Sequence, residues 1–279
     1  MNLAHSQFED TLRFLGAAAV FFAGFAPPSR AAEATPDLSG FWERPEAGNA
    51  RMYYPVPGRT GPLTNIDTSG EFTIGDPTNP ILKPVAAAAV KAQADKSRAG
   101  IVTYPAWSLC WPTGVPLNVN MAEPVQFLQT ADQVTILYQR GMTVRRIDMN
   151  RPHPANPKPS WFGHSVGHYE GGDTLVVDTV AQDPRSLVDR FGTPKSAAFH
   201  VVERYTISPD RTKLDVVFTV DDPNIFTTAW TARIPYERPA ARRGYDPANP
   251  VFTEVVCAEN NRDAGGGDFA VPVDDTPDF

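Results

Sequence analysis

Hydrophobic and polar residues alternate with a period of two through most of the chain from residue 125 to residue 236. Alternation over a short run predicts a strand with one buried face. Turn signals such as Arg140-Gly141 and Pro209-Asp210 separate the runs, so neighbouring strands are expected to form hairpins. The expected strands are Val125–Thr130, Val134–Gln139, Val144–Met149, His164–Glu170, Thr174–Val180, Phe199–Ser208, Lys213–Val220 and Thr228–Tyr236.

A meander of this length is sufficient to close on itself. We therefore predict an all-β fold, an antiparallel up-and-down β-barrel of lipocalin-like type with one peripheral α-helix. The helix is expected from Lys83 to Arg98, because a proline stands in its first turn, its body is rich in alanine and Gly100 follows it. Residues 44–82 are rich in Pro, Gly, Thr and Asn and are expected to form a loop.

The first residues have the pattern of an export signal. Arg13 precedes the apolar run Phe14–Ala26, which is too short to span a bilayer, and small residues follow at Ala32 and Ala34. We predict a signal peptide over 1–34, a single β-barrel domain over 35–260 and a mobile tail over 261–279. The alternative for the first segment is a buried helix. Export implies a periplasmic or secreted protein.

Composition narrows the class of protein. Of 279 residues, 42% are hydrophobic and 20% charged, which suits a packed domain and not a disordered chain. The net charge of -7 leaves no basic excess for nucleic acid. No later run is long and apolar enough for a membrane span. Because nucleotide and zinc motifs are absent, we predict neither a cofactor nor a metal.

Strand alternation also places two charged residues among apolar ones. Glu203 shares a face with Val201 and Tyr205, and Arg145 shares a face with Ile147. A buried charge is costly unless it is paired, so Arg145 and Glu203 are expected to meet each other or a ligand. Both alternatives, a structural ion pair and a pair that orients a substrate, are open at this point.

The run from Gly163 to Glu170 concentrates ionisable groups. His164, His168 and Glu170 share one face of the expected strand, with Asp178 in reach across the hairpin. A zinc site is excluded, because four residues of strand separate the two imidazoles by about 13 Å. A histidine beside a carboxylate is a general acid–base unit, and the alternative is a ladder of surface charges.

Aromatic residues supply candidate ligand contacts. Trp161, Phe162 and Trp230 are candidates for a cavity mouth, although such residues more often pack in the core, and we add Tyr169 and Tyr205. The first functional hypothesis is a cofactor-independent lyase, isomerase or hydrolase that binds a hydrophobic small molecule in the lumen. The second is a non-catalytic periplasmic carrier. The third is a structural or interaction module whose barrel is filled with side chains.

Many short motifs together resemble one family of exported bacterial proteins. They occur in order at Asp37–Trp42, Cys110–Pro116, Arg145–Met149, Arg151–Pro154, Gly163–Gly171, Asp173–Thr179, Glu203–Tyr205 and Asp222–Trp230. The resemblance implies export and brings no activity or substrate with it. The turn after Glu170 has one glycine more than the family pattern, which leaves the register of the 164–180 hairpin open. The Gly-x-Trp at Gly40 is similar to that of lipocalins, in architecture alone.

We predict that Cys110 and Cys257 form a disulfide, because they are the only two cysteines and the periplasm is oxidising. A bridge that closes so long a loop contributes about 4–5 kcal/mol in the entropic model. Peptide mapping of the exported protein without reductant should recover one crosslinked pair. Two thiols that react with an alkylating reagent would contradict the pairing.

Overall fold

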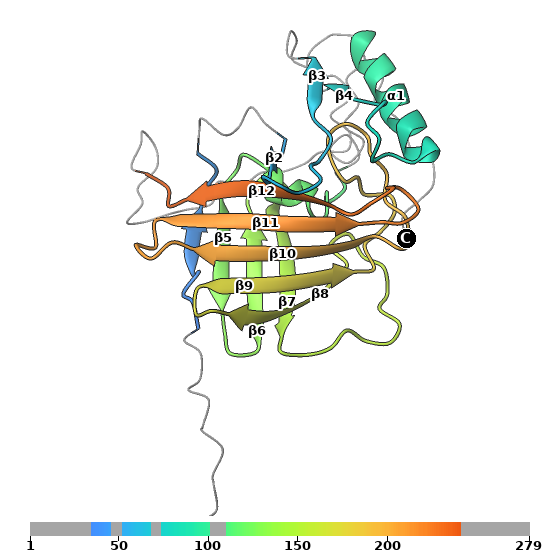
Figure 1. Cartoon of the computed structure of the whole chain (residues 1–279). Coiled ribbons are helices and arrows are strands. Elements are labelled where there is room, and N and C mark those ends of the chain that lie inside the picture. The colour runs from blue at the N-terminus through green and yellow to red at the C-terminus, as the bar shows by residue number, and fades with distance from the viewer. Residues whose placement is uncertain (1–34, 46–51, 68–73, 101–109, 241–279) are drawn as a thin grey trace, which may run out of the picture. The chain divides into compact units, whose positions relative to one another are not determined.

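The computed structural model describes residues 35–45, 52–67, 74–100 and 110–240. Within them, ten strands form one curled sheet, two short strands form a second sheet, and helix α1 packs against the second sheet (Figure 1). The elements are β1 (Gly40–Trp42), β2 (Tyr54–Pro55), β3 (Asn65–Asp67), β4 (Ile74–Gly75), α1 (Pro84–Arg98), the 3₁₀ turn η2 (Leu117–Asn120), β5 (Val125–Gln129), β6 (Gln133–Tyr138), the 3₁₀ turn η3 (Arg140–Met142), β7 (Thr143–Met149), β8 (His164–Glu170), β9 (Thr174–Val180), β10 (His200–Ile207), β11 (Lys213–Asp221) and β12 (Trp230–Glu237).

The large sheet has the strand order β1-β5-β6-β7-β8-β9-β10-β11-β12-β2 and curls into a half-barrel. The curl brings the end of β1, at one edge of the sheet, against β12 near the opposite edge. Glu43, directly after β1, and Glu237 of β12 exchange two backbone hydrogen bonds of 2.9 and 2.8 Å. The adjacent Arg238 places its guanidinium 3.7 Å from the ring centre of Trp42. The prediction of an all-β, barrel-like fold with a peripheral helix is confirmed.

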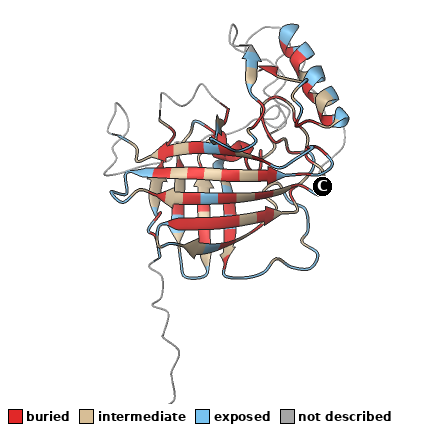
Figure 2. Cartoon of the chain, in the orientation of Figure 1, coloured by how far each residue is buried: buried red, intermediate tan, exposed pale blue. Residues whose placement is uncertain are grey.

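The inside of the curled sheet is a packed apolar core. Buried and more exposed residues alternate along β10 and β11 (Figure 2), as the sequence predicts for strands with one inner face. The inner residues of the other strands continue the same cluster, among them Phe127, Val134, Ile136, Ile147, Leu175, Val177, Val216, Phe218, Ala232 and Ile234. The barrel-like sheet is therefore held together from within by its own side chains.

One strand pair departs from the predicted meander. β7 and β8 run parallel and pair only at Ile147 with Ser165, Asp148 with Val166 and Met149 with Gly167. Parallel neighbours need a connection of about a dozen residues to return the chain, whereas a tight turn joins antiparallel strands. The Pro-rich connection 150–163 has that length. It carries the chain back alongside β7, so β8 runs in the same direction as β7. All other pairs of the large sheet are antiparallel.

Helix α1 covers Pro84–Arg98, as predicted. A proline stands at its start and Lys96 and Arg98 lie in its last turn. Its buried residues are the small Ala86, Val90, Ala94 and Ser97, so it offers only a narrow apolar face. None of the helices in the part of the chain that the structure describes has the length and apolar character to cross a membrane.

Several sequence predictions need a correction or stay predictions. Residues 44–82 are not entirely loop, because β2, β3 and β4 form there as short strands of two or three residues, too brief to show an alternating pattern. The signal peptide over 1–34, the tail over 261–279 and Cys257 lie outside the described residues. None of the described cysteines is free, and the pairing of Cys110 with Cys257 stays a prediction.

Gly167 sets how closely β7 approaches β8. A Cβ on this residue would lie 2.9 Å from Cγ2 of Ile147, 3.1 Å from Sδ of Met149 and 3.1 Å from the backbone oxygen of Val176. Gly167→Ala should therefore lower the free energy of unfolding by about 1–3 kcal/mol through overpacking. Gly61→Ala is the matched control, because its Cβ would make an ordinary 3.6 Å contact. Chemical denaturation measures both, and equal midpoints for the two variants would contradict this packing.

Candidate functional site

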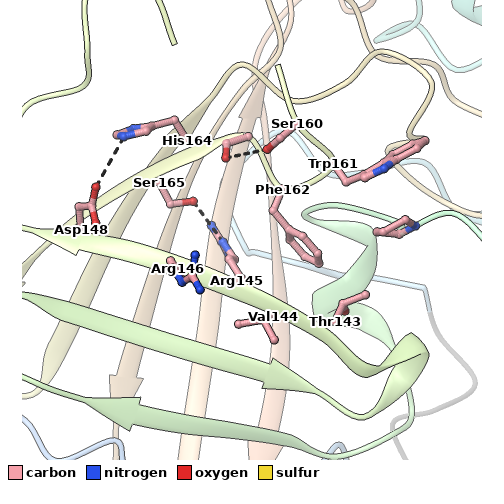
Figure 3. Close-up of a pocket in the computed structure, with 12 residues that line it drawn as sticks. Thr143, Val144, Arg145, Arg146, Asp148, Ser160, Trp161, Phe162, His164 and Ser165 are labelled. Atoms are coloured by element: carbon pink, nitrogen blue, oxygen red, sulfur yellow. Dashed lines mark hydrogen bonds and ion pairs between the residues drawn. The ribbon is translucent and has the colours of Figure 1, made fainter. Parts of the chain in front are cut away.

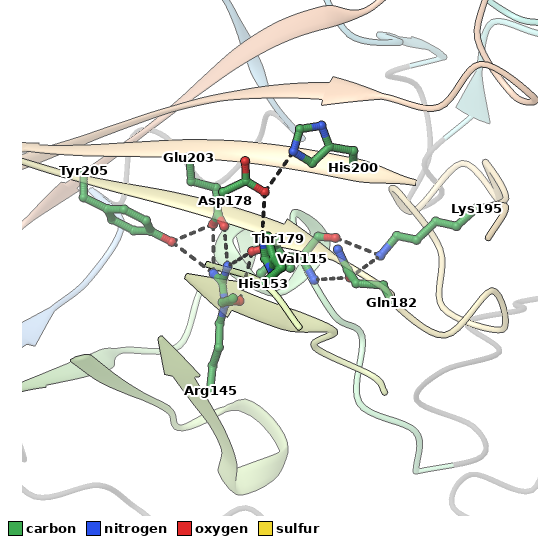
Figure 4. A network of polar contacts seen from close by, with 11 residues as sticks. Val115, Arg145, His153, Asp178, Thr179, Gln182, Lys195, His200, Glu203 and Tyr205 are labelled. Atoms are coloured by element: carbon green, nitrogen blue, oxygen red, sulfur yellow. Dashed lines mark hydrogen bonds and ion pairs between the residues drawn. The ribbon is translucent and has the colours of Figure 1, made fainter. Parts of the chain in front are cut away.

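Arg145 of β7 and Glu203 of β10 form an ion pair inside the sheet. Nη2 of Arg145 lies 2.5 Å from Oε2 of Glu203, and Nη1 donates to Oε1 at 3.0 Å, so the pair is bidentate (Figure 4). Neither side chain is exposed to solvent. The prediction that alternation turns both residues inward is confirmed, and of the two alternatives that were open, each other or a ligand, the structure shows that they meet each other.

Neutral hydroxyls complete the surroundings of this pair. Nε of Arg145 donates to Ser165, Nη2 donates to Thr179 at 2.8 Å, and the Tyr205 hydroxyl donates to Glu203 at 2.7 Å. Burial is the largest influence and by itself would lower the pKa of Arg145, but the Glu203 carboxylate together with the Tyr205 and Tyr138 hydroxyls outweighs it and holds that pKa well above its usual value. All three guanidinium nitrogens have acceptors within the protein. The pair therefore has the contacts of a structural ion pair, and Tyr205 is part of it.

A second buried cation holds two loops together. Nζ of Lys195 donates to the backbone oxygen of Val115 at 2.8 Å, to Oε1 of Gln182 at 2.9 Å and to Oγ of Ser186 at 3.1 Å (Figure 4). Burial lowers the pKa of Lys195. Three acceptors nevertheless match the three N–H bonds of an ammonium group, so the geometry favours the charged form. This lysine is buried, and its role is to link the two loops.

A pocket opens in the wall of the sheet where β7 and β8 separate. Because the two strands pair only from Ile147 and Ser165 onward, the first residues of β7 and the residues before β8 leave a gap between them. The pocket has a volume of about 490 Å³. Figure 3 shows the residues that line it, which come from β7, from the end of the 150–163 connection, from the start of β8 and from Pro112: Thr143, Val144, Arg145, Arg146, Asp148, Ser160, Trp161, Phe162, Gly163, His164 and Ser165.

The pocket has an aromatic end. Phe162 stacks on the buried Tyr138 with ring centres 5.7 Å apart, and Trp161 lies 5.3 Å from Trp111. The guanidinium of Arg185 covers Trp161 at 4.6 Å. In Figure 3, Phe162 and Trp161 lie toward the start of β7, whereas His164 and Asp148 lie together at the other end. The aromatic candidates Trp161 and Phe162 thus meet the candidate base His164 around one pocket.

A chain of three histidines and two aspartates, which we call the histidine cluster, crosses the outer face of the sheet beside this pocket. Nδ1 of His153 lies 2.8 Å from Nδ1 of His164, and Nε2 of His153 lies 3.1 Å from Oδ1 of Asp178. Nε2 of His200 approaches the same Asp178 oxygen at 3.0 Å. Nε2 of His164 lies 3.7 Å from Oδ2 of Asp148. The cluster thus joins β7, β8, β9, β10 and the 150–163 connection.

Hydrogen-bonding rules assign the protons of this cluster when the imidazoles are neutral. A carboxylate only accepts, so Nε2–H of His153 donates to Asp178, and its Nδ1 carries a lone pair. Nδ1–H of His164 must then donate to His153, which leaves Nε2 of His164 unprotonated. That nitrogen faces Asp148. The arrangement prepares His164 to accept a proton at Nε2 and to keep it beside a carboxylate.

Other predicted site residues lie elsewhere. His168 and Glu170 are exposed and bind each other at 2.8 Å, with Arg204 on the second oxygen of Glu170. The register pairs His168 with Val176 and Glu170 with Thr174, so neither meets Asp178 as the hairpin prediction expected. The register of the β8–β9 hairpin places Asp178 opposite Val166, and Asp178 reaches His164 only through His153.

Two aromatic candidates do not line the pocket either. Trp230 is buried in the core, with ring centres 5.9 Å from Phe218 and 5.8 Å from Phe226, so the packing reading of this residue is correct. Tyr169 is partly buried and its hydroxyl accepts a hydrogen bond of 2.8 Å from Gln129. Trp230 belongs to the core cluster and Tyr169 packs against it, so neither ring faces the pocket.

Sequence reasoning missed several residues of the cluster and pocket. Alternation does place Arg146 and Asp148 on one outer face of β7, and His200 on an outer face of β10. His153 carries no such signal, because it lies in a proline-rich connection without periodicity. Among the described residues, no group of three or more His, Cys, Asp or Glu side chains is arranged to hold a metal ion.

The chain matches no family model and no curated protein. The resemblance to a family of exported bacterial proteins therefore stays a prediction, and the candidate site rests on its own geometry.

Loss of the Glu203 charge should destabilise the fold strongly. Glu203→Gln leaves the Arg145 guanidinium buried without its carboxylate, which typically costs about 3–5 kcal/mol. Glu170→Gln removes a solvent-screened partner of Arg204 and should leave the unfolding midpoint nearly unchanged. Urea denaturation compares the two variants with the parent protein. Similar midpoints for both variants would show that the buried pair does not carry this stability.

Proposed function

We propose that this protein binds a partly hydrophobic small molecule in the pocket between β7 and β8, and that His164 acts on it as a general base and acid without a cofactor. We place this activity in the periplasm or outside the cell, on the export pattern of the sequence. The proposal moves the expected ligand from the lumen to the wall of the barrel, since the inner face of the sheet is a packed core.

One observation carries the catalytic part. His164 lines the pocket while its Nδ1 is held by His153, which is held in turn by Asp178. Enzymes fix the tautomer of a catalytic histidine through a hydrogen bond from its second ring nitrogen, and here His153, itself bound to Asp178, accepts that bond. His164 is 26% exposed and lines the pocket, so a bound molecule can reach it, whereas His153 does not line the pocket.

The chemistry follows from the proton positions. Nε2 of His164 would take a proton from a bound molecule, and the positive imidazolium would then be stabilised by Asp148 at one nitrogen. The same nitrogen can return the proton to another atom of the molecule. Proton transfer of this kind serves isomerases, lyases and hydrolases alike, so the geometry supports the reaction type and not one member of it.

A carrier function uses the same pocket without proton transfer. The aromatic end of Phe162 and Trp161 favours binding by either protein class. The two differ in what happens to the bound molecule, and this difference is measurable.

The test incubates the purified protein with a bacterial metabolite extract and follows all small molecules by mass spectrometry. An enzyme should consume one compound and form another, and His164→Ala should slow this conversion by about 10²–10⁴-fold. His168→Ala is the control, because His168 is a histidine of the same strand that does not line the pocket. Conversion by His164→Ala at the parent rate would remove His164 from the reaction. A compound that is retained and never converted would assign a carrier.

A further inference from the structure

The ionisable groups around the pocket differ in whether their charge is already balanced. Arg145 is neutralised by Glu203 inside the sheet. Asp148 lies 3.7 Å from Nε2 of His164, so a protonated His164 imidazole would balance the charge of this carboxylate. Arg146 lines the pocket and is exposed, and over the described ranges it has no hydrogen-bond or ion-pair partner. Among the described residues that line the pocket, Arg146 is therefore the cation for which none of them supplies a partner.

The outer residues of β7 change from apolar to charged along the pocket. Val144, Arg146 and Asp148 point to the same side, with about 6.5–7 Å between successive positions. The strand thus offers an apolar, then a cationic, then an anionic side chain. Phe162 and Trp161 lie toward the apolar end and His164 lies beside Asp148 (Figure 3). Arg146 stands between the aromatic end and the base.

We propose that the pocket selects an organic acid, with its carboxylate on Arg146, its apolar body against Val144 and Phe162, and the atoms next to the carboxylate toward His164. This inference rests on the proposed function and names its ligand class. A carboxylate matches the planar fork of a guanidinium and can bind it through two hydrogen bonds. A phosphate dianion is less suited, because Asp148 follows Arg146 on the same face and would repel the second charge.

Calorimetric titration with a matched pair of probes tests this inference. 2-Naphthoate and 2-naphthamide share a ring system and differ in charge, so their affinities isolate the contribution of the carboxylate. The titrations are run at pH 8, where imidazole side chains are ordinarily neutral, so that Arg146 is the cation under test. The parent protein should bind naphthoate about 10–100-fold more tightly than naphthamide.

Three variants locate the effect. Arg146→Gln should bind the two probes with equal affinity, while Arg233→Gln should keep the preference, because Arg233 is a comparably exposed arginine of β12 that does not line the pocket and pairs with Asp215. Val144→Asp should weaken the binding of both probes, because it places a charge at the apolar end of the pocket. The fold should tolerate this change, since Val144 is 49% exposed. The preference in the parent protein should also shrink as salt is added.

The outcomes separate this inference from the proposed function. Equal affinity of the parent protein for both probes, or an unchanged preference in Arg146→Gln, overturns the assignment of an organic acid and leaves the pocket as a binding site. Absence of binding by either probe overturns the pocket itself and with it the proposed function. A preference that only Arg146→Gln removes supports both.

Discussion

Arg145 carries a full positive charge into the interior of the sheet, where water cannot solvate it. Such a charge persists only if an oppositely charged group and enough hydrogen-bond acceptors reach it in a fixed geometry. Glu203 is that group, and it comes from β10, three strands away from β7 in the sheet order. The sheet must therefore curl until the inner faces of these strands approach each other. The buried pair and the curvature of the barrel require one another.

The connection 150–163 determines which features form on the outer face of β7 and β8. Its length returns the chain to the start of β7, so β8 pairs in parallel, and the short pairing leaves the pocket between the two strands. The same connection carries His153 over the outer face to His164 and Asp178. One irregular segment thus produces the opening, its aromatic end and the partner that orients the candidate base.

The inner and outer sides of β7 and β8 consequently have different tasks. Ser165 faces inward and accepts a hydrogen bond from Arg145, whereas its neighbour His164 faces outward and joins the histidine cluster. Arg145 and Arg146 divide in the same way, the first enclosed with Glu203 and the second exposed at the pocket. Adjacent residues of a strand therefore link a rigid structural network directly to a solvent-accessible site, which holds the site residues in place.

The sequence by itself determined the strands from residue 125 onward, the helix and the inward direction of Arg145 and Glu203. These features depend on local alternation and on residues that begin or end an element, and both are written in neighbouring positions. Only the tertiary structure decided the direction of β8, the pocket and the assembly of His153, His164 and Asp178. The path of a proline-rich connection has no period to read, and the register of a hairpin depends on its turn. Contacts between residues of four neighbouring strands and a loop exist only after these strands have paired in register and the loop has crossed them, so no local pattern could predict them.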